Sequence, residues 1–105
     1  MRLLNKLTTA LLVLFSAGAA LAQDSAMLHA RGLAATCASC HGTEGRTVEG
    51  SAIPSLVGMP KSYMVMQMNA FKDGSRPATV MHQISKGITD VQIDRLASYF
   101  AATKR

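Results

Sequence analysis

The feature that most restricts this chain is the stretch CASCH at residues 37–41, which holds both of its cysteines and one of its three histidines. Two cysteines separated by two residues suit three chemistries: a redox-active dithiol, half of a zinc site, or covalent attachment of a c-type haem with the following histidine as iron ligand. Each chemistry needs different surroundings. The rest of the sequence therefore decides between them.

The N-terminal segment predicts export from the cytoplasm. Basic residues in MRLLNK are followed by the apolar stretch LTTALLVLFSAGAALA, which ends in small residues. This pattern is typical of a secretory signal peptide, here residues 1–22, with cleavage before Gln23. A membrane anchor is the alternative, but a spanning helix needs about 20 apolar residues. This stretch is shorter and is interrupted by Thr8, Thr9, Ser16 and Gly18.

Cleavage leaves residues 23–105, enough for one small domain. Domains of this size rarely bury enough apolar surface to be stable without a disulfide, a metal or another staple, and a large apolar cofactor can supply the missing core. Two of the eleven basic residues leave with the signal peptide, so the remaining domain is only mildly basic. It has no run of Lys or Arg, and we expect no nucleic-acid partner.

The cysteine motif fits haem better than its alternatives. A disulfide between Cys37 and Cys40 would close too short a loop to stabilise a fold much. A thioredoxin-like dithiol needs alternating strands and helices, and the sequence shows no convincing strand. Structural zinc needs about four ligands, and beyond the motif only His29 and His82 are strong candidates.

Covalent haem c uses every residue of the motif. The thiols of Cys37 and Cys40 can add to the two vinyl groups of the haem as thioethers, and His41 then lies against the iron. Ala38 and Ser39 are small and leave room for the edge of the macrocycle. The sequence therefore predicts one covalent haem c.

The remaining pattern is helical. Helices are predicted over residues 24–36, over 61–74 with Ser62 as N-cap and Gly74 as stop, and over 77–87, opened by Pro77 and closed by Gly87. A last helix over residues 89–105 starts with a capping box formed by Thr89 and Gln92. Glycines and a proline in GTEGRTVEGSAIPSL indicate a loop that wraps the haem edge. The fold class is thus an all-α single domain.

The chain resembles the class I c-type cytochromes. The resemblance rests on CASCHG, on the proline-x-leucine element in IPSL, and on a late methionine followed by a closing helix with the pair Tyr99 and Phe100. It implies the class I cytochrome c fold, a small helical domain over residues 23–105 wrapped around one haem. It also implies that the first and last helices cross, with Gly32 or Leu33 packing against Leu96 and Tyr99.

Within that class, the stretch YMVMQMNAFKDGSRPATVMHQISKGITDVQIDRLASYFA is similar to the cytochrome c4 and flavocytochrome c group. The nearest likeness is the cytochrome subunit of flavocytochrome c sulfide dehydrogenase, in a single-haem version. Because this chain has one attachment motif, it departs from two-haem members. Transfer between haems does not carry over to it.

Met81 is the predicted sixth iron ligand, because it lies in the segment that matches the family's distal ligand. His82 is the alternative, and it would give a lower reduction potential. Neighbours on a helix point about 100° apart, so only one of the two can face the iron. Met59 is a further possibility in a loop, whereas Met64, Met66 and Met68 are predicted to fill the core. His29 and His82 are then surface or partner-facing residues.

Further residues are predicted to support the haem. By resemblance, the carbonyl of Pro54 accepts the free ring N–H of His41 and fixes its tautomer. Arg46, Lys61 and Arg76 are candidates to bind the propionates. Apolar packing around the macrocycle is expected from Ile53, Leu56, Val57, Met66, Phe71 and Leu96.

The predicted function is electron transfer in the periplasm, without catalysis by this chain itself. With both axial positions filled, no coordination site remains for a substrate. The resemblance implies a flavoprotein (FAD) partner that oxidises sulfide, with this chain as its cytochrome subunit or electron acceptor, and no stable membrane anchor after cleavage. A free-standing soluble carrier between periplasmic redox partners is the alternative. A small zinc or dithiol redox protein is the remote alternative.

Overall fold

The computed structural model describes Met1 and residues 25–104. The predicted signal peptide, residues 1–22, and its cleavage site lie outside the described residues apart from Met1. Residues 25–35 are helical and are followed by α2 (Ala38–His41), the 3-10 helix η1 (Thr43–Gly45), α3 (Lys61–Asp73), α4 (Met81–Lys86) and α5 (Asp90–Ala102). Residues 25–104 contain no strand, which agrees with the all-α prediction. Within them, no helix is both long and apolar enough to cross a membrane.

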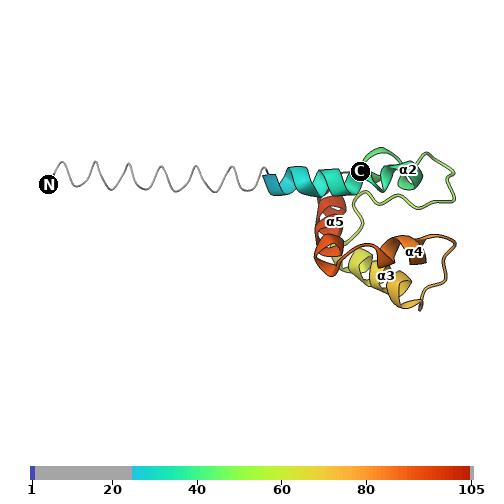
Figure 1. Ribbon diagram of the computed structural model, residues 1–105. Helices are drawn as coiled ribbons and strands as arrows, with labels where there is room; N and C mark the ends of the chain where they lie inside the picture. The colour runs from blue at the N-terminus through green and yellow to red at the C-terminus, as the bar shows by residue number, and fades with distance from the viewer. Residues whose placement is uncertain (2–24, 105) are drawn as a thin grey trace.

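The helices form two parts that α5 joins (Figure 1). The helix over residues 25–35 leads directly into α2, and α5 runs across it. At the other end of α5, α3 packs against both α5 and α4. The motif CASCH and the predicted ligand Met81 therefore lie on different parts of the fold.

The core lies where the first helix, α3 and α5 meet. Its buried members are Ala34, Met64, Leu96, Ala97 and Phe100, and Leu33 and Tyr99 are partly buried against them. The predicted crossing of the first and last helices is thus confirmed with Leu33. Gly32 does not take part, because a Cβ atom at this position would meet no atom within 4 Å.

Two predicted helix starts are wrong. The N-cap of α3 is Pro60 and not Ser62, since the Pro60 carbonyl already accepts the Met64 N–H at 3.1 Å. Pro77 does not open a helix, because α4 begins only at Met81 with Val80 as N-cap.

The late start of α4 has a local cause. Gly74 ends α3 as predicted and has a left-handed conformation (φ 83°), and after it the Arg76 N–H returns to the Ala70 carbonyl at 3.0 Å. The guanidinium of Arg76 also lies 4.6 Å from the ring centre of Phe71. These contacts hold the chain against α3, so that the next helix starts later. Gly87 then closes α4, as predicted.

The methionine run on α3 is only partly core. Met64 is buried and Met68 packs against the core cluster, as predicted. Met66 is 56% exposed, so the prediction that it fills the protein core is wrong. Met64, Val65 and Met68 contact the core, and helical geometry turns Met66 away from the face that these residues share.

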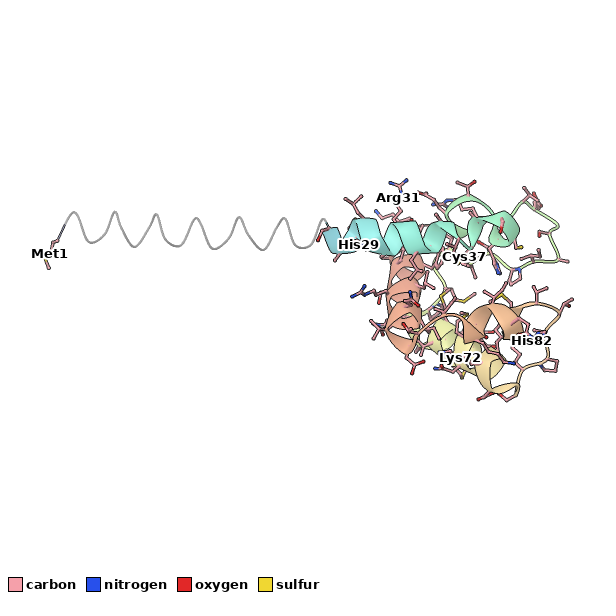
Figure 2. All side chains as sticks on the ribbon, viewed as in Figure 1. Met1, His29, Arg31, Cys37, Lys72 and His82 are labelled. Atoms are coloured by element: carbon pink, nitrogen blue, oxygen red, sulfur yellow. The ribbon has the colours of Figure 1, made fainter. Side chains whose placement is uncertain are left out.

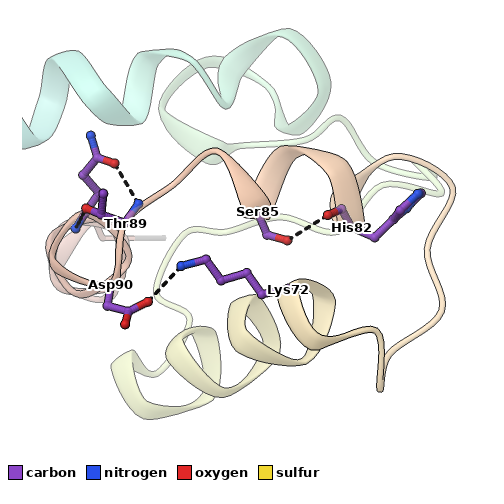
Figure 3. A network of polar contacts seen from close by, with 6 residues as sticks. Lys72, His82, Ser85, Thr89 and Asp90 are labelled. Atoms are coloured by element: carbon purple, nitrogen blue, oxygen red, sulfur yellow. Dashed lines mark hydrogen bonds and ion pairs between the residues drawn. The ribbon is translucent and has the colours of Figure 1, made fainter.

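Among residues 25–104, three ion pairs connect the elements. Arg31 of the first helix meets Glu44 of η1 at 2.9 Å, and α3 is joined to α5 by Lys61 with Asp94 at 2.7 Å and by Lys72 with Asp90 at 2.8 Å (Figure 3). Exposed pairs of this kind contribute about 0 to 1 kcal/mol each. They orient helices that apolar burial already holds together.

The capping box of α5 offers a test of how much this helix start stabilises the domain. The Thr89 hydroxyl accepts the Gln92 N–H at 3.2 Å, while the Gln92 side chain accepts the Thr89 N–H at 2.9 Å. Thr89→Ala is expected to lower the free energy of unfolding by about 1 kcal/mol, because one orphan helix N–H loses its acceptor. Urea unfolding of the variant measures this loss. Thr89→Ser keeps the acceptor and should retain most of the stability; equal losses in both variants would contradict the capping explanation.

Candidate functional site

Residues 37–41 form a single helical turn that places the motif's donors together. Cys37 is the N-cap of α2, and its carbonyl accepts the His41 N–H at 2.9 Å. The side chains of Cys37 and His41, four residues apart, share one face of this turn. Both cysteines are free thiols. The turn therefore presents two thiols and an imidazole side by side.

The two thiols differ in their surroundings. Cys37 is half-buried at the edge of the core, whereas Cys40 is exposed. Burial raises the pKa of the Cys37 thiol, and a hydrogen bond with Thr36 partly opposes this rise. Because its side chain is exposed, Cys40 is the more accessible thiol of the pair.

His41 has a defined tautomer. Its Nδ1 lies 2.7 Å from the Pro54 carbonyl oxygen. Because a carbonyl can only accept, Nδ1 carries the proton and donates it, and Nε2 keeps the lone pair that binds metals. The ring that follows the two thiols is thus prepared to act as a ligand through Nε2.

The chain reverses sharply after His41. Gly42 has φ 80°, and a Cβ atom at this position would lie 1.9 Å from the Arg46 carbonyl oxygen. Only glycine tolerates a positive φ here and also leaves the space beside the Arg46 carbonyl free, because it has no Cβ atom. The turn at Gly42 carries the chain into η1 and from there towards Pro54.

Met81 and His82 begin α4, and both are half-buried. Figure 2 shows Cys37 at the first helix and His82 on the part of the fold formed by α3 and α4. The Nδ1 atom of His82 is buried without a hydrogen-bond partner in the described structure, and the His82 carbonyl faces the Ser85 hydroxyl at 3.4 Å (Figure 3). His82 is thus half-buried, whereas His29 is exposed as predicted, and a partner-facing role for either histidine stays a prediction.

The three cations predicted to bind propionates have partners within the protein. Arg46 donates to the Lys104 carbonyl, Lys61 pairs with Asp94, and Arg76 donates to the Gln67 side chain. All three residues are exposed at the surface. Sequence patterns do not separate such surface contacts from a role at the cofactor.

The donor set fits a haem better than a zinc ion. Among the described residues, no group of three or more His, Cys, Asp or Glu side chains is placed to hold a metal ion. Large apolar side chains are exposed next to the candidate ligands: Ile53 precedes Pro54, Val80 precedes Met81, and Ile84 follows on α4. Two thioether-forming thiols, an oriented imidazole and apolar surface are what a covalent haem requires.

An open depression of about 460 Å³ lies beside Cys40. Val48, which is 80% exposed, belongs to its lining. The charged residues of the lining are Glu44, which pairs with Arg31, and Arg46. The surface beside the exposed cysteine is therefore accessible and close to neutral.

Comparison with known proteins gives consistent matches. The family model described as cytochrome c matches residues 17–104. The cytochrome subunit of sulfide dehydrogenase from Chlorobaculum tepidum is 43% identical over 68 residues, which are 65% of this chain and 60% of that protein. The thiosulfate dehydrogenase electron acceptor of Thiomonas intermedia is 35% identical over 71 residues, 68% of this chain and 33% of that protein.

A solved structure shares the fold. The cytochrome c4 of Acidithiobacillus ferrooxidans superposes with a TM-score of 0.59 at 35% sequence identity, over 63% of this chain and 37% of the other. The matched regions thus span between one third and three fifths of these relatives' lengths.

Proposed function

This chain belongs to the cytochrome c family, and from that membership we propose that it is a periplasmic single-haem protein that accepts electrons from a flavoprotein sulfide dehydrogenase. The chain has the class I cytochrome c fold, and members of its family carry covalently bound haem c and transfer electrons without catalysing a reaction of their own. What we propose beyond family membership is the periplasmic location of this chain, its redox partner and the roles of its individual residues.

In this proposal, Cys37 and Cys40 form the two thioether bonds, and His41 and Met81 are the axial ligands. Haem c, when bound, supplies one-electron cycling of its iron. His41 contributes a ring that the Pro54 carbonyl holds in one orientation. The same hydrogen bond makes the Nε2 lone pair more basic towards a metal. Met81 contributes a thioether, a ligand that raises the reduction potential relative to a second imidazole.

The observation that carries the assignment is the short contact between His41 Nδ1 and the Pro54 carbonyl oxygen. A metal-binding histidine almost always donates its other ring N–H to such an acceptor. The contact joins the histidine that directly follows the two cysteines to a segment thirteen residues further along the chain. A dithiol redox centre would have no need for this orientation.

The choice of partner rests on the relatives. The protein from Chlorobaculum tepidum is a cytochrome subunit of sulfide dehydrogenase. A flavin takes two electrons from a reduced sulfur compound and passes them on singly, so it needs a one-electron acceptor such as this chain. The depression beside Cys40 is a surface at which such a partner can approach the haem.

Thiosulfate oxidation is a second candidate process. Electron acceptors of thiosulfate dehydrogenase from Thiomonas intermedia and Stutzerimonas stutzeri are each 35% identical to this chain over about two thirds of its length. In that case the chain would be a free-standing carrier that meets its donor only briefly.

One experiment separates the two candidates. Periplasmic extract of the native source is fractionated by size, with absorption spectra and mass spectrometry of this chain across the elution, and each haem fraction is mixed with sulfide or with thiosulfate. Co-elution with flavin and rapid haem reduction by sulfide are expected. Haem that elutes alone at the size of the mature chain, reduced only after a thiosulfate-oxidising fraction is added, would favour the free carrier. A Cys37→Ser/Cys40→Ser chain, which cannot form thioethers, is the control for covalent haem.

A further inference from the structure

We propose that Ser55 is a positioning residue for the iron ligand His41: its hydroxyl holds the Pro54 carbonyl on the histidine ring and thereby sets the reduction potential. The inference rests on the proposed function, because it takes His41 as an axial ligand. It concerns a side chain that the motif does not contain.

The first observation is a pair of hydrogen bonds on one carbonyl. The Ser55 hydroxyl donates to the Gly45 carbonyl at 2.9 Å, and the Leu56 N–H donates to the same oxygen at 2.9 Å. The two donors, Ser55 and Leu56, are the next two residues after Pro54 in the chain. The segment after Pro54 is therefore fastened to Gly45 at two successive residues.

The second observation is that Gly45 is closely packed against the core. It is buried, and a Cβ atom added to it would lie 2.7 Å from Phe100 Cε1 and 3.0 Å from Leu56 Cβ. Phe100 is only 1% exposed and belongs to the core. A further bond, from the Gly58 N–H to the Phe100 carbonyl at 2.9 Å, ties the same segment to α5. The carbonyl that receives the Ser55 hydroxyl is thus fixed by the core of the domain.

The geometry of proline makes this anchor effective. The ring of Pro54 fixes φ, so rotation about the bond between Cα and the carbonyl carbon is the main freedom left to its carbonyl group. That rotation would swing Ser55 and Leu56 away from Gly45. While both bonds hold, the Pro54 oxygen stays 2.7 Å from His41 Nδ1.

The consequence for the iron follows from the hydrogen bond itself. An imidazole that donates Nδ1–H to a strong acceptor gains electron density, which makes Nε2 more basic and favours iron(III). When the Pro54 carbonyl is free to rotate, the bond weakens and the ligand donates less. The reduction potential then rises.

The test compares three variants of the haem-loaded protein. Ser55→Ala removes the hydroxyl, Ser55→Thr keeps it, and Ser98→Ala removes a hydroxyl that donates to the Asp94 carbonyl on α5, also at 2.9 Å. Two readouts apply: solvent exchange of the His41 Nδ1 proton by NMR in the reduced protein, and the midpoint potential. Ser55 is on the surface, so its truncation leaves the core intact.

Ser55→Ala is expected to speed exchange of the Nδ1 proton about fivefold, corresponding to the loss of about 1 kcal/mol from one hydrogen bond. The midpoint potential should rise at the same time. Ser55→Thr should restore both values, and Ser98→Ala should leave both unchanged.

Unchanged exchange and potential in Ser55→Ala would overturn the proposal, and so would a Ser55→Thr variant that behaves like Ser55→Ala. Failure of the proposed function has a different signature. In that case the parent protein lacks a haem spectrum, or His41→Ala leaves the spectrum unaltered.

Discussion

Replacing Gly42 with alanine is expected to destabilise the folded domain by about 4 kcal/mol or more, enough to unfold much of it. The added methyl group would lie 1.9 Å from the Arg46 carbonyl oxygen, a backbone atom that cannot rotate away. The positive φ of 80° adds strain for any residue other than glycine. The turn that follows the haem-attachment motif would have to open.

Gly50→Ala is the matched control for this prediction. Gly50 has nearly the same φ, 79°, but a Cβ atom there would meet nothing within 4 Å. Its replacement should cost only about 1 kcal/mol, the penalty for a left-handed backbone with a side chain. Urea unfolding of both variants, followed by circular dichroism, separates strain from collision. Equal losses in the two proteins would show that the chain around Arg46 relaxes and that the collision is not decisive.

Removing the thioether of Met81 is expected to have the second large effect. Met81→Ala should lower the reduction potential, because methionine ligation raises it. It should also open the iron to added imidazole. If the thioether occupies the iron about 99% of the time, the apparent affinity for imidazole rises about a hundredfold when this competitor is removed. Redox titration and an optical imidazole titration measure the two changes.

Met59→Ala and His82→Ala are the controls for this assignment. Met59 is another half-buried methionine, and His82 is the neighbouring alternative ligand. Neither variant should change the potential or the imidazole affinity by as much as Met81→Ala. A low-spin spectrum and potential that stay unaltered in Met81→Ala, with a loss in one of the others, would assign the sixth ligand to that residue.

Local sequence signals predicted the features that depend on few neighbours. The capping box of Thr89 and Gln92 and the helix stop at Gly74 each depend on a few adjacent residues, and both are present in the structure. The start of α4 was missed because it depends on contacts of Arg76 with α3, which lie several residues back in the chain. The exposure of Met66 was missed for a related reason, since apolar character alone does not reveal which helix face is covered.

In the candidate site, too, some residues could be predicted from the sequence and others depend on contacts between distant segments. The attachment motif is readable because its chemistry requires a fixed spacing, and the position of Pro54 beside His41 was expected from family resemblance. Gly45 and Ser55 were not singled out, because their roles come from a contact between two loops and Phe100. The glycine in TEGR was the available signal, since a buried left-handed position excludes other residues, but glycine is equally common in exposed turns.

The placement of CASCH and Met81 on separate parts of the fold also has a mechanical meaning. Iron bonded to both His41 and Met81 would cross-link the chain and close a loop of about 40 residues. Such a cross-link lowers the conformational entropy of the unfolded chain and thereby stabilises the folded state by roughly 4 kcal/mol, as a disulfide of that span does. Otherwise the two parts are joined through α5, by a small core that the first helix, α3 and α5 share and by two ion pairs between α3 and α5. A change that weakens the iron–sulfur bond would therefore loosen the whole domain, so that electron affinity and resistance to unfolding are adjusted by the same atom.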